Sequence, residues 1–213
     1  MGIDMSGMVE IRPWSHHRGP QECPWEVAIP LEHLNVTRNY DALGCLFGAM
    51  NFAGFEPIAP ERGLPADVSV RTRRAYDREH RRDPEHAGLW PTWIGWDEIQ
   101  AVDWDERALR SDARLHEFAR DPDGGEWAYR SKAAWSPRPF EVMGLPVPPP
   151  GTGPTTWPEG ATWTAGDVQF RASVLTRRDA VPPGSAWQPV WDTMELLANL
   201  HDGHCRLVIW FDR

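Results

Sequence analysis

The sequence has little lysine, little cysteine and no long apolar run, and each shortage excludes a class of protein. Lys132 is the only lysine, and the 3 cysteines (Cys23, Cys45 and Cys205) lack the spacing of a metal or redox motif. No stretch approaches the roughly 20 apolar residues that span a bilayer. Met1–Met8 has neither the basic nor the apolar region of a secretory signal. We therefore expect a cytoplasmic protein that has reduced thiols and does not interact with a membrane.

Common enzyme motifs are also missing. The sequence contains no phosphate loop, dinucleotide fingerprint, serine-nucleophile elbow or zinc-protease helix. The net charge is −9, from 22 basic and 31 acidic side chains. Because a negative field repels phosphates, nucleic acid is not an expected partner. The sequence indicates no particular cofactor, so whether the protein uses one stays unknown.

Tryptophan is the residue in excess, with 13 copies beside 3 tyrosines. An indole ring is large and apolar, and its N–H needs a partner when it is buried. Two interpretations follow: a core in which tryptophan replaces smaller residues, or an aromatic wall around a ligand. Trp93 and Trp96 are three residues apart, so they can share one face of a helix and contact a flat ligand.

Hydrophobic periodicity predicts an α+β fold. Helices are expected from Asn39 or Asp41 to about Phe52 with Gly54 as the cap, from Asp67 or Ser69 to Arg82, within Thr92–Trp104, over Glu106–Arg120 and over Trp187–His201. Strands are expected over Met8–Trp14, Trp25–Leu31 and Arg206–Phe211, and a strand or a hairpin is expected over Thr162–Thr176. If the two terminal strands pair, they form a small, mainly antiparallel sheet packed by several helices, which we place on one face.

The length suits one domain over residues 1–213. Residues 136–160 are rich in proline and glycine and are expected to form a long loop without regular structure. Loops of this length inside a domain often cover a binding site.

Pairing of the termini would also bring chemically active side chains together. The catalytic candidates are Asp4, Glu10, His201 and Asp212, and the weak metal candidates are His201 and His204. Carboxylates and imidazoles of this kind serve acid–base or metal-assisted hydrolysis. Two histidines three apart, with Gly203 between them, differ from the usual helical zinc pair. The alternative is a helix-terminal His201 that is stabilised by the helix dipole.

The segment from Arg62 to Ser69 is a further candidate. Gly63 and Pro65 suit a tight turn, and Asp67 or Ser69 can cap the helix that follows. A helix N-terminus also binds anions. Capping and ligand binding both remain open for this segment.

Several short segments, in this order, resemble an uncharacterised protein family of actinobacteria and phages. They are Gly2-Ile3-Asp4 with Glu10, Arg38-Asn39-Tyr40-Asp41, Arg62-Gly63-Leu64-Pro65-Ala66-Asp67-Val68-Ser69, Thr92–Glu98 and Val208–Asp212. The resemblance implies no activity, but it implies one functional surface that contains Asp4, Arg38, Asn39, Asp41, Arg62, Asp67 and Asp212. Met5-Ser6 stands where related members often carry a histidine, which weakens a metal site.

We therefore expect an intracellular accessory protein that binds a small molecule or a protein partner in a Trp-rich, carboxylate-lined cleft. The expected ligand-binding residues are Arg38, Asn39, Asp41, Arg62, Asp67, Trp93 and Trp96. One alternative is an Asp/His-based hydrolase or transferase, with or without a metal. Another is a host-interaction protein of a mobile element. Whether the protein is an enzyme stays open.

Overall fold

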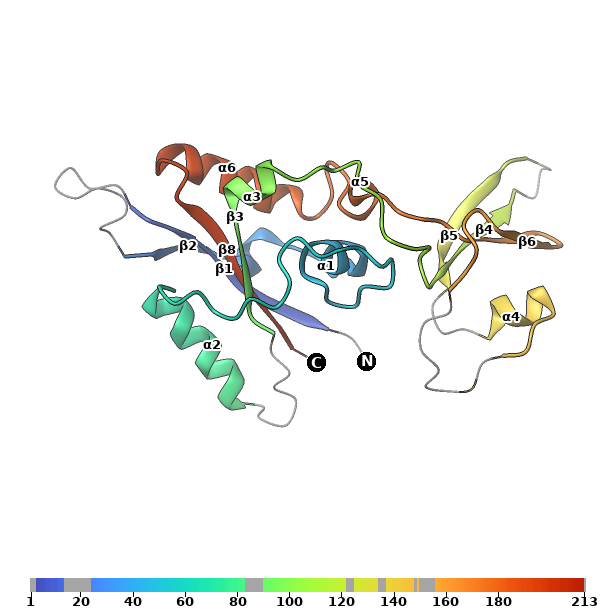
Figure 1. Ribbon diagram of the computed structural model, residues 1–213, viewed down its shortest axis with the longest axis horizontal. Coiled ribbons are helices and arrows are strands. Elements are labelled where there is room, and N and C mark those ends of the chain that lie inside the picture. The colour runs from blue at the N-terminus through green and yellow to red at the C-terminus, as the bar shows by residue number, and fades with distance from the viewer. Residues whose placement is uncertain are drawn as a thin grey trace.

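The computed structural model describes residues 3–13, 24–82, 90–121, 125–133, 137–147, 149 and 156–212. Its helices and strands form two lobes that lie along the long axis of the molecule (Figure 1). The first lobe holds both ends of the chain, and the second is built from a middle stretch. The predicted α+β class is confirmed, with two four-stranded antiparallel sheets in the described part of the chain.

The first sheet joins the two ends of the chain. Its strand order is β2 (Glu26–Pro30), β1 (Asp4–Ile11), β8 (Cys205–Asp212) and β3 (Thr92–Gly95). β1 and β8 pair antiparallel along their full length, from Asp4 opposite Asp212 to Ile11 opposite Cys205. The predicted pairing of the terminal strands is therefore confirmed. A 3-10 turn, η2 (Leu31–Leu34), follows β2.

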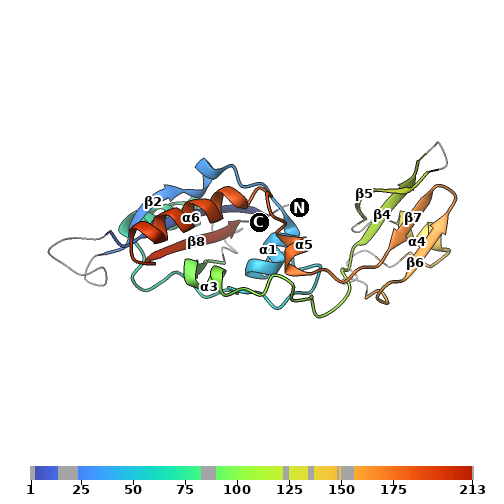
Figure 2. The same cartoon turned by 90° about the horizontal axis from the view of Figure 1, so that it is seen from above.

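Helices cover both faces of this sheet, as Figures 1 and 2 show. One face carries α1 (Tyr40–Phe47), α3 (Trp96–Gln100), α5 (Arg177–Ala180) and α6 (Gln188–Leu200), and the other carries α2 (Val70–Arg82). In β8, the Phe211 ring packs on Phe47 of α1, whereas the neighbouring Trp210 ring meets Tyr76 of α2 edge-on. The prediction of helices on one face is wrong, because a strand that is apolar on both sides must be covered twice.

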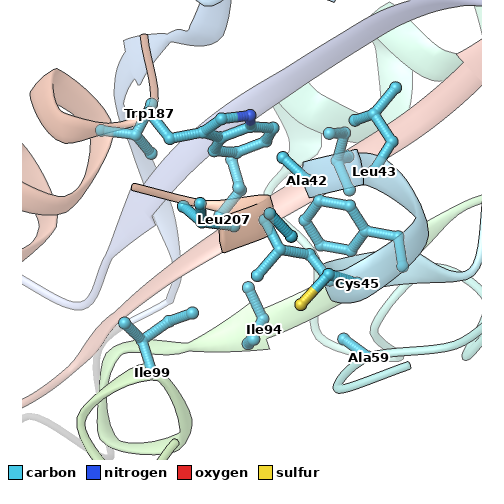
Figure 3. Close-up of a cluster of buried hydrophobic side chains, with 14 of the residues drawn as sticks. Ala42, Leu43, Cys45, Ala59, Ile94, Ile99, Trp187 and Leu207 are labelled. Atoms are coloured by element: carbon cyan, nitrogen blue, oxygen red, sulfur yellow. The ribbon is translucent and has the colours of Figure 1, made fainter. Parts of the chain in front are cut away.

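The main hydrophobic core lies between the sheet and the helices α1 and α6 (Figure 3). Leu43, Cys45, Trp187, Met194 and Leu207 are all 0% exposed within it. The helix predicted over Trp187–His201 is confirmed as α6, and the predicted burial of Cys45 is confirmed as well. Part of the tryptophan excess therefore fills the core, as the first interpretation expected.

α1 begins as predicted but ends early. The Asn39 side chain accepts hydrogen bonds from the backbone N–H groups of Asp41 and Ala42, so Asn39 is the N-cap. The helix ends at Phe47 because Gly48 follows in the left-handed region, with φ +79°, and closes the last turn. The predicted continuation to Phe52 with Gly54 as the cap is wrong.

The second sheet has the order β5 (Trp127–Ala133), β4 (Leu115–Arg120), β7 (Val168–Arg171) and β6 (Thr162–Ala165). The helix predicted over Glu106–Arg120 is wrong, since its second half is the central strand β4. Leu115 pairs across the sheet with β5 and is buried against Phe170, and this tertiary pairing overrides a weak helical pattern. The hairpin predicted over Thr162–Thr176 is confirmed as β6 and β7.

The Pro/Gly-rich segment contains a helix. α4 (Arg138–Met143) packs on β6, and Pro139 is tolerated because it lies in the first turn. The expectation that residues 136–160 lack regular structure is wrong for this part, and residues 136, 148 and 150–155 lie outside the described residues.

Backbone hydrogen bonds join the two lobes. Leu109 N–H donates to the Gly54 carbonyl and Ala113 N–H to the Phe52 carbonyl, both at 3.0 Å. Each lobe has its own hydrophobic cluster. A single domain over residues 1–213 stays a prediction.

Candidate binding groove

A groove of about 630 Å³ opens at the end of the first sheet where β8 begins and β3 ends. Its volume is in the range of pockets that hold small ligands. It is lined by Trp25, Arg62, Leu64, Pro65, Ala66, Asp67, Trp93, Gly95, Asp97, Asp202, Gly203, His204, Cys205 and Arg206. The groove therefore gathers residues from the loop before α2, from β3, and from the turn between α6 and β8.

A buried ion pair lies beneath the groove. Glu10 is 0% exposed and accepts hydrogen bonds from Arg206 Nε at 3.0 Å and Nη2 at 2.9 Å. It also accepts from the Ser69 backbone N–H at 3.1 Å and from the Thr72 hydroxyl. A buried charge is tolerated when it is paired and fully hydrogen-bonded. Glu10 thus anchors the start of α2, where the Ser69 hydroxyl accepts from Thr72 N–H as the predicted cap.

Arginine and tryptophan side chains alternate across the groove. We call Arg12, Trp25, Arg206, Trp93 and Arg62 the Arg–Trp ladder. The Trp25 ring lies between two guanidinium groups, with its centroid 4.9 Å from Arg12 Cζ and 3.9 Å from Arg206 Cζ. The Trp93 ring is 6.0 Å from Arg206 Cζ and 5.2 Å from Arg62 Cζ. Such contacts each contribute about 0.5–2 kcal/mol, so the ladder holds the two indoles in place.

Two carboxylates neutralise the ladder. Asp67 accepts from Arg206 Nη1 and Trp25 Nε1, both at 2.8 Å, and from Arg12. Partial burial opposes ionisation, but these donors lower the pKa of Asp67 to about 2. Arg62 bonds to Glu98 at 2.9 Å. Burial raises the pKa of Glu98, but the bond from Arg62, the bond from the Gly95 N–H and the positive charge of Arg62 together lower it below its ordinary value. Both groups are therefore ionised at neutral pH.

Asp97 and Asp202 are different, because their carboxylates are exposed at the groove. Within the described ranges, neither has an ion pair or a side-chain hydrogen bond. Among the described residues around the groove, the three arginines of the ladder stand against five carboxylates: Asp67, Asp97, Glu98, Asp202 and the Glu10 below. The groove therefore carries an excess of negative charge with aromatic walls.

The structure separates the predicted catalytic residues. Glu10 lies below the groove, with His204 at its rim, whereas Asp4 is six residues away along β1, or about 20 Å. In the strand register Asp4 is paired with Asp212 at the far end of the sheet, where Arg38 forms an ion pair with Asp4. His201 ends α6, and its buried Nδ1 has no hydrogen-bond partner among the described residues. No group of three or more His, Cys, Asp or Glu side chains that suits a metal occurs in the described part.

The predicted ligand-binding residues also lie in several places. Arg62, Asp67 and Trp93 line the groove, whereas Trp96 lies in another cleft beside α6. Asn39 caps α1 and donates to the Ala180 carbonyl at 3.2 Å. Arg38 pairs with Asp4, and Asp41 lies between the lobes. The predicted ligand-binding residues therefore do not lie together on one surface of the protein.

Asp41 belongs to an ionic cluster that ties the lobes together. Its carboxylate binds Arg114 and Lys132, the latter at 2.6 Å. Asp112, which is 0% exposed, accepts from Arg114 Nε at 2.9 Å and lies 3.2 Å from Lys132 Nζ. Burial opposes its ionisation, yet His116 and Arg114 hold the pKa of Asp112 well below its usual range. Lys132, the only lysine of the chain, thus contributes to the ionic contact between the lobes.

Sequence reasoning missed Trp25, Asp97, Asp202 and Arg206. Arg206 carried the clearest signal, since an arginine at the start of an otherwise apolar strand needs a buried partner. Trp25 and the two aspartates had no distinguishing pattern.

Comparisons with known protein families, with curated proteins and with solved structures found no match to this chain. The resemblance to an actinobacterial and phage family therefore stays a prediction. Among the described residues, no helix has the length and apolar character needed to cross a membrane.

Proposed function

We propose that this protein is a binding protein and that its groove takes a small organic cation, such as an amine or a guanidinium compound. The observation that carries the proposal is the pair of exposed carboxylates, Asp97 and Asp202, which lie beside the Arg–Trp ladder and have no ion-pair partner among the described residues. Carboxylates attract a cation, and indole rings favour its apolar parts. The negative excess disfavours phosphates and other anions.

The hydrogen bonding of the buried carboxylates supports binding over acid–base catalysis. Glu10 and Asp67 both accept bonds from Arg206, so neither oxygen pair is free to take a proton from a substrate at neutral pH. The low pKa of Asp67 has the same consequence. A protein partner that presents a basic side chain, and a cytoplasmic location, belong to the same proposal.

Calorimetric titration with spermidine and with arginine methyl ester tests this function. The wild-type chain should bind at least one of them, and added salt should weaken binding. Asp97→Asn and Asp202→Asn should each weaken it about five- to tenfold, since removing one partly screened charge costs about 1 kcal/mol.

Asp167→Asn is the matched control, because Asp167 is exposed in the β6–β7 turn of the other lobe. Its affinity should equal that of wild type. If wild type binds neither cation, or if Asp167→Asn weakens binding as much as the groove variants, the proposal is wrong.

A further inference from the structure

The outer side of α2 carries a row of arginines. Arg71, Arg74, Arg78 and Arg81 follow one another at steps of three, four and three residues, so they line one side of the helix over ~15 Å. All four are exposed, and we call them the arginine stripe. The chain as a whole has a net charge of −9, so the stripe is a local reversal of sign.

The inner side of α2 fixes the helix to the first sheet (Figure 1). The Tyr76 ring meets the Trp210 ring edge-on, with centroids 5.8 Å apart, and Glu79 accepts a hydrogen bond from Trp210 Nε1. Glu10 and Ser69 hold the start of the helix. The helix is therefore a rigid support for the stripe, and the stripe itself takes no part in the core.

The charges of the stripe are not compensated within the described part of the chain. The side chains of Arg71, Arg74 and Arg78 have neither an ion pair nor a hydrogen bond there, and Arg81 Nε donates only to the Asp77 carbonyl at 3.0 Å. The carboxylate of Asp77, beside the stripe, also has no ion pair among the described residues. The guanidinium groups are therefore open to an anion from outside.

The arrangement of the stripe disfavours the helix that carries it. Arg71 lies near the positive end of the helix dipole, in a first turn that has no acidic residue. Arg74 and Arg78 are four residues apart, which is the spacing at which like charges repel. A helix face that only meets water typically mixes both signs and so avoids these costs. A face of one sign is instead stabilised when a partner supplies the opposite charge.

We propose that the arginine stripe binds a short acidic helix of a partner protein. Guanidinium groups bind carboxylates through paired N–H bonds, and arginine clusters commonly recognise acidic segments. Carboxylates three and four residues apart on a helix have the same spacing as the stripe. A long polyanion such as nucleic acid would extend past the stripe into the negative field of the rest of the chain, whereas a short segment ends with it. The stripe shares no residue with the groove, so each proposal can be tested without the other.

Fluorescence anisotropy with a labelled, capped alanine-rich peptide of about 15 residues tests the proposal, with glutamates placed at the steps of the stripe. The same peptide with glutamine in place of glutamate is the ligand control. Wild type should bind the glutamate peptide, and added salt should weaken binding. Arg74→Gln/Arg78→Gln should weaken it about tenfold, and Arg74→Lys/Arg78→Lys, which keeps the charge but removes the paired donors, should weaken it less.

Arg120→Gln/Arg130→Gln is the matched control, because it removes the same charge from two exposed arginines of the second sheet and should leave binding unchanged. Thermal melting shows whether each variant is folded, and Arg71→Gln alone keeps the test valid if Arg74→Gln/Arg78→Gln unfolds.

Four outcomes would overturn the proposal. They are no binding by wild type at low salt, equal binding of the glutamine peptide, an equal loss in the control variant, and tighter binding of a DNA duplex of about 15 base pairs that Arg74→Gln/Arg78→Gln abolishes. The last outcome would assign the stripe to nucleic acid.

Discussion

The buried pair of Glu10 and Arg206 is the sharpest test of how the first lobe is held together. Glu10→Ala removes the acceptor of four hydrogen bonds and leaves a guanidinium with a side chain only 6% exposed. Breaking a buried pair on one side typically costs about 3–5 kcal/mol. At about 2–4 °C per kcal/mol for a chain of this size, the midpoint of thermal unfolding should fall by about 6–20 °C.

The same strand provides the control. Asp4 lies at the other end of β1, and its ion pair with Arg38 joins side chains that are 72% and 50% exposed. Exposed pairs contribute about 0–1 kcal/mol because water screens them. Asp4→Ala should therefore change the free energy of unfolding by less than about 1 kcal/mol.

Urea denaturation followed by far-ultraviolet circular dichroism measures both variants, with the free energy extrapolated to water. Glu10→Gln, which keeps the shape, should lose less than Glu10→Ala. The double variant Glu10→Met/Arg206→Met should recover part of the loss, because the buried charge is gone but the Ser69 N–H and the Thr72 hydroxyl still lack their acceptor. If Glu10→Ala is as stable as Asp4→Ala, the argument that this pair anchors α2 and β8 is refuted.

Three further predictions concern pH, thiol chemistry and backbone conformation. The pKa of Asp67 is about 2 in the folded protein and about 3.9 in an unfolded chain, so its contribution to stability is complete above about pH 4 and is lost as the pH falls toward 2. In urea titrations at several pH values, the free energy of unfolding of Asp67→Asn should fall less over this pH range than that of wild type. If both proteins lose the same free energy of unfolding, the assignment to Asp67 is contradicted. Burial raises the pKa of Cys45 to about 11 and that of Cys205 to about 12, so at pH 8 both should resist iodoacetamide until urea is added, as peptide mass spectrometry can check. Gly54 and Gly63 both have positive φ, but only at Gly54 would a Cβ meet a side chain, at 2.6 Å. Gly63→Ala should thus cost about 1–2 kcal/mol and Gly54→Ala more; equal midpoints in urea would argue against this contact.

The two lobes also differ in how well their secondary structure could be predicted from the sequence. α6 was readable because its apolar residues repeat with the helical period over three turns. A helix is wrongly predicted for the second half of Glu106–Arg120, because a polar stretch with few apolar residues has almost no hydrophobic periodicity that could distinguish a strand from a helix. Its strand conformation depends on β5 and β7, which pair with it on either side.

For the groove, the sequence indicated Arg62, Asp67 and Trp93, because a stiff turn with a capping aspartate and a concentration of tryptophans are local patterns. The sequence could not show that Glu10 and Arg206, which are 196 positions apart, form a buried ion pair. Nor could it show that Asp4 and Glu10 occupy opposite ends of one strand with different partners.

The sequence by itself determined the two terminal strands as separate elements, the main helix and the burial of its apolar face, since periodicity and capping act over a few residues. Only the tertiary structure decided which charges meet, on which faces the sheet is covered and where the groove opens. Those features arise from contacts between distant segments, whose free energies depend on burial and geometry that no local pattern encodes.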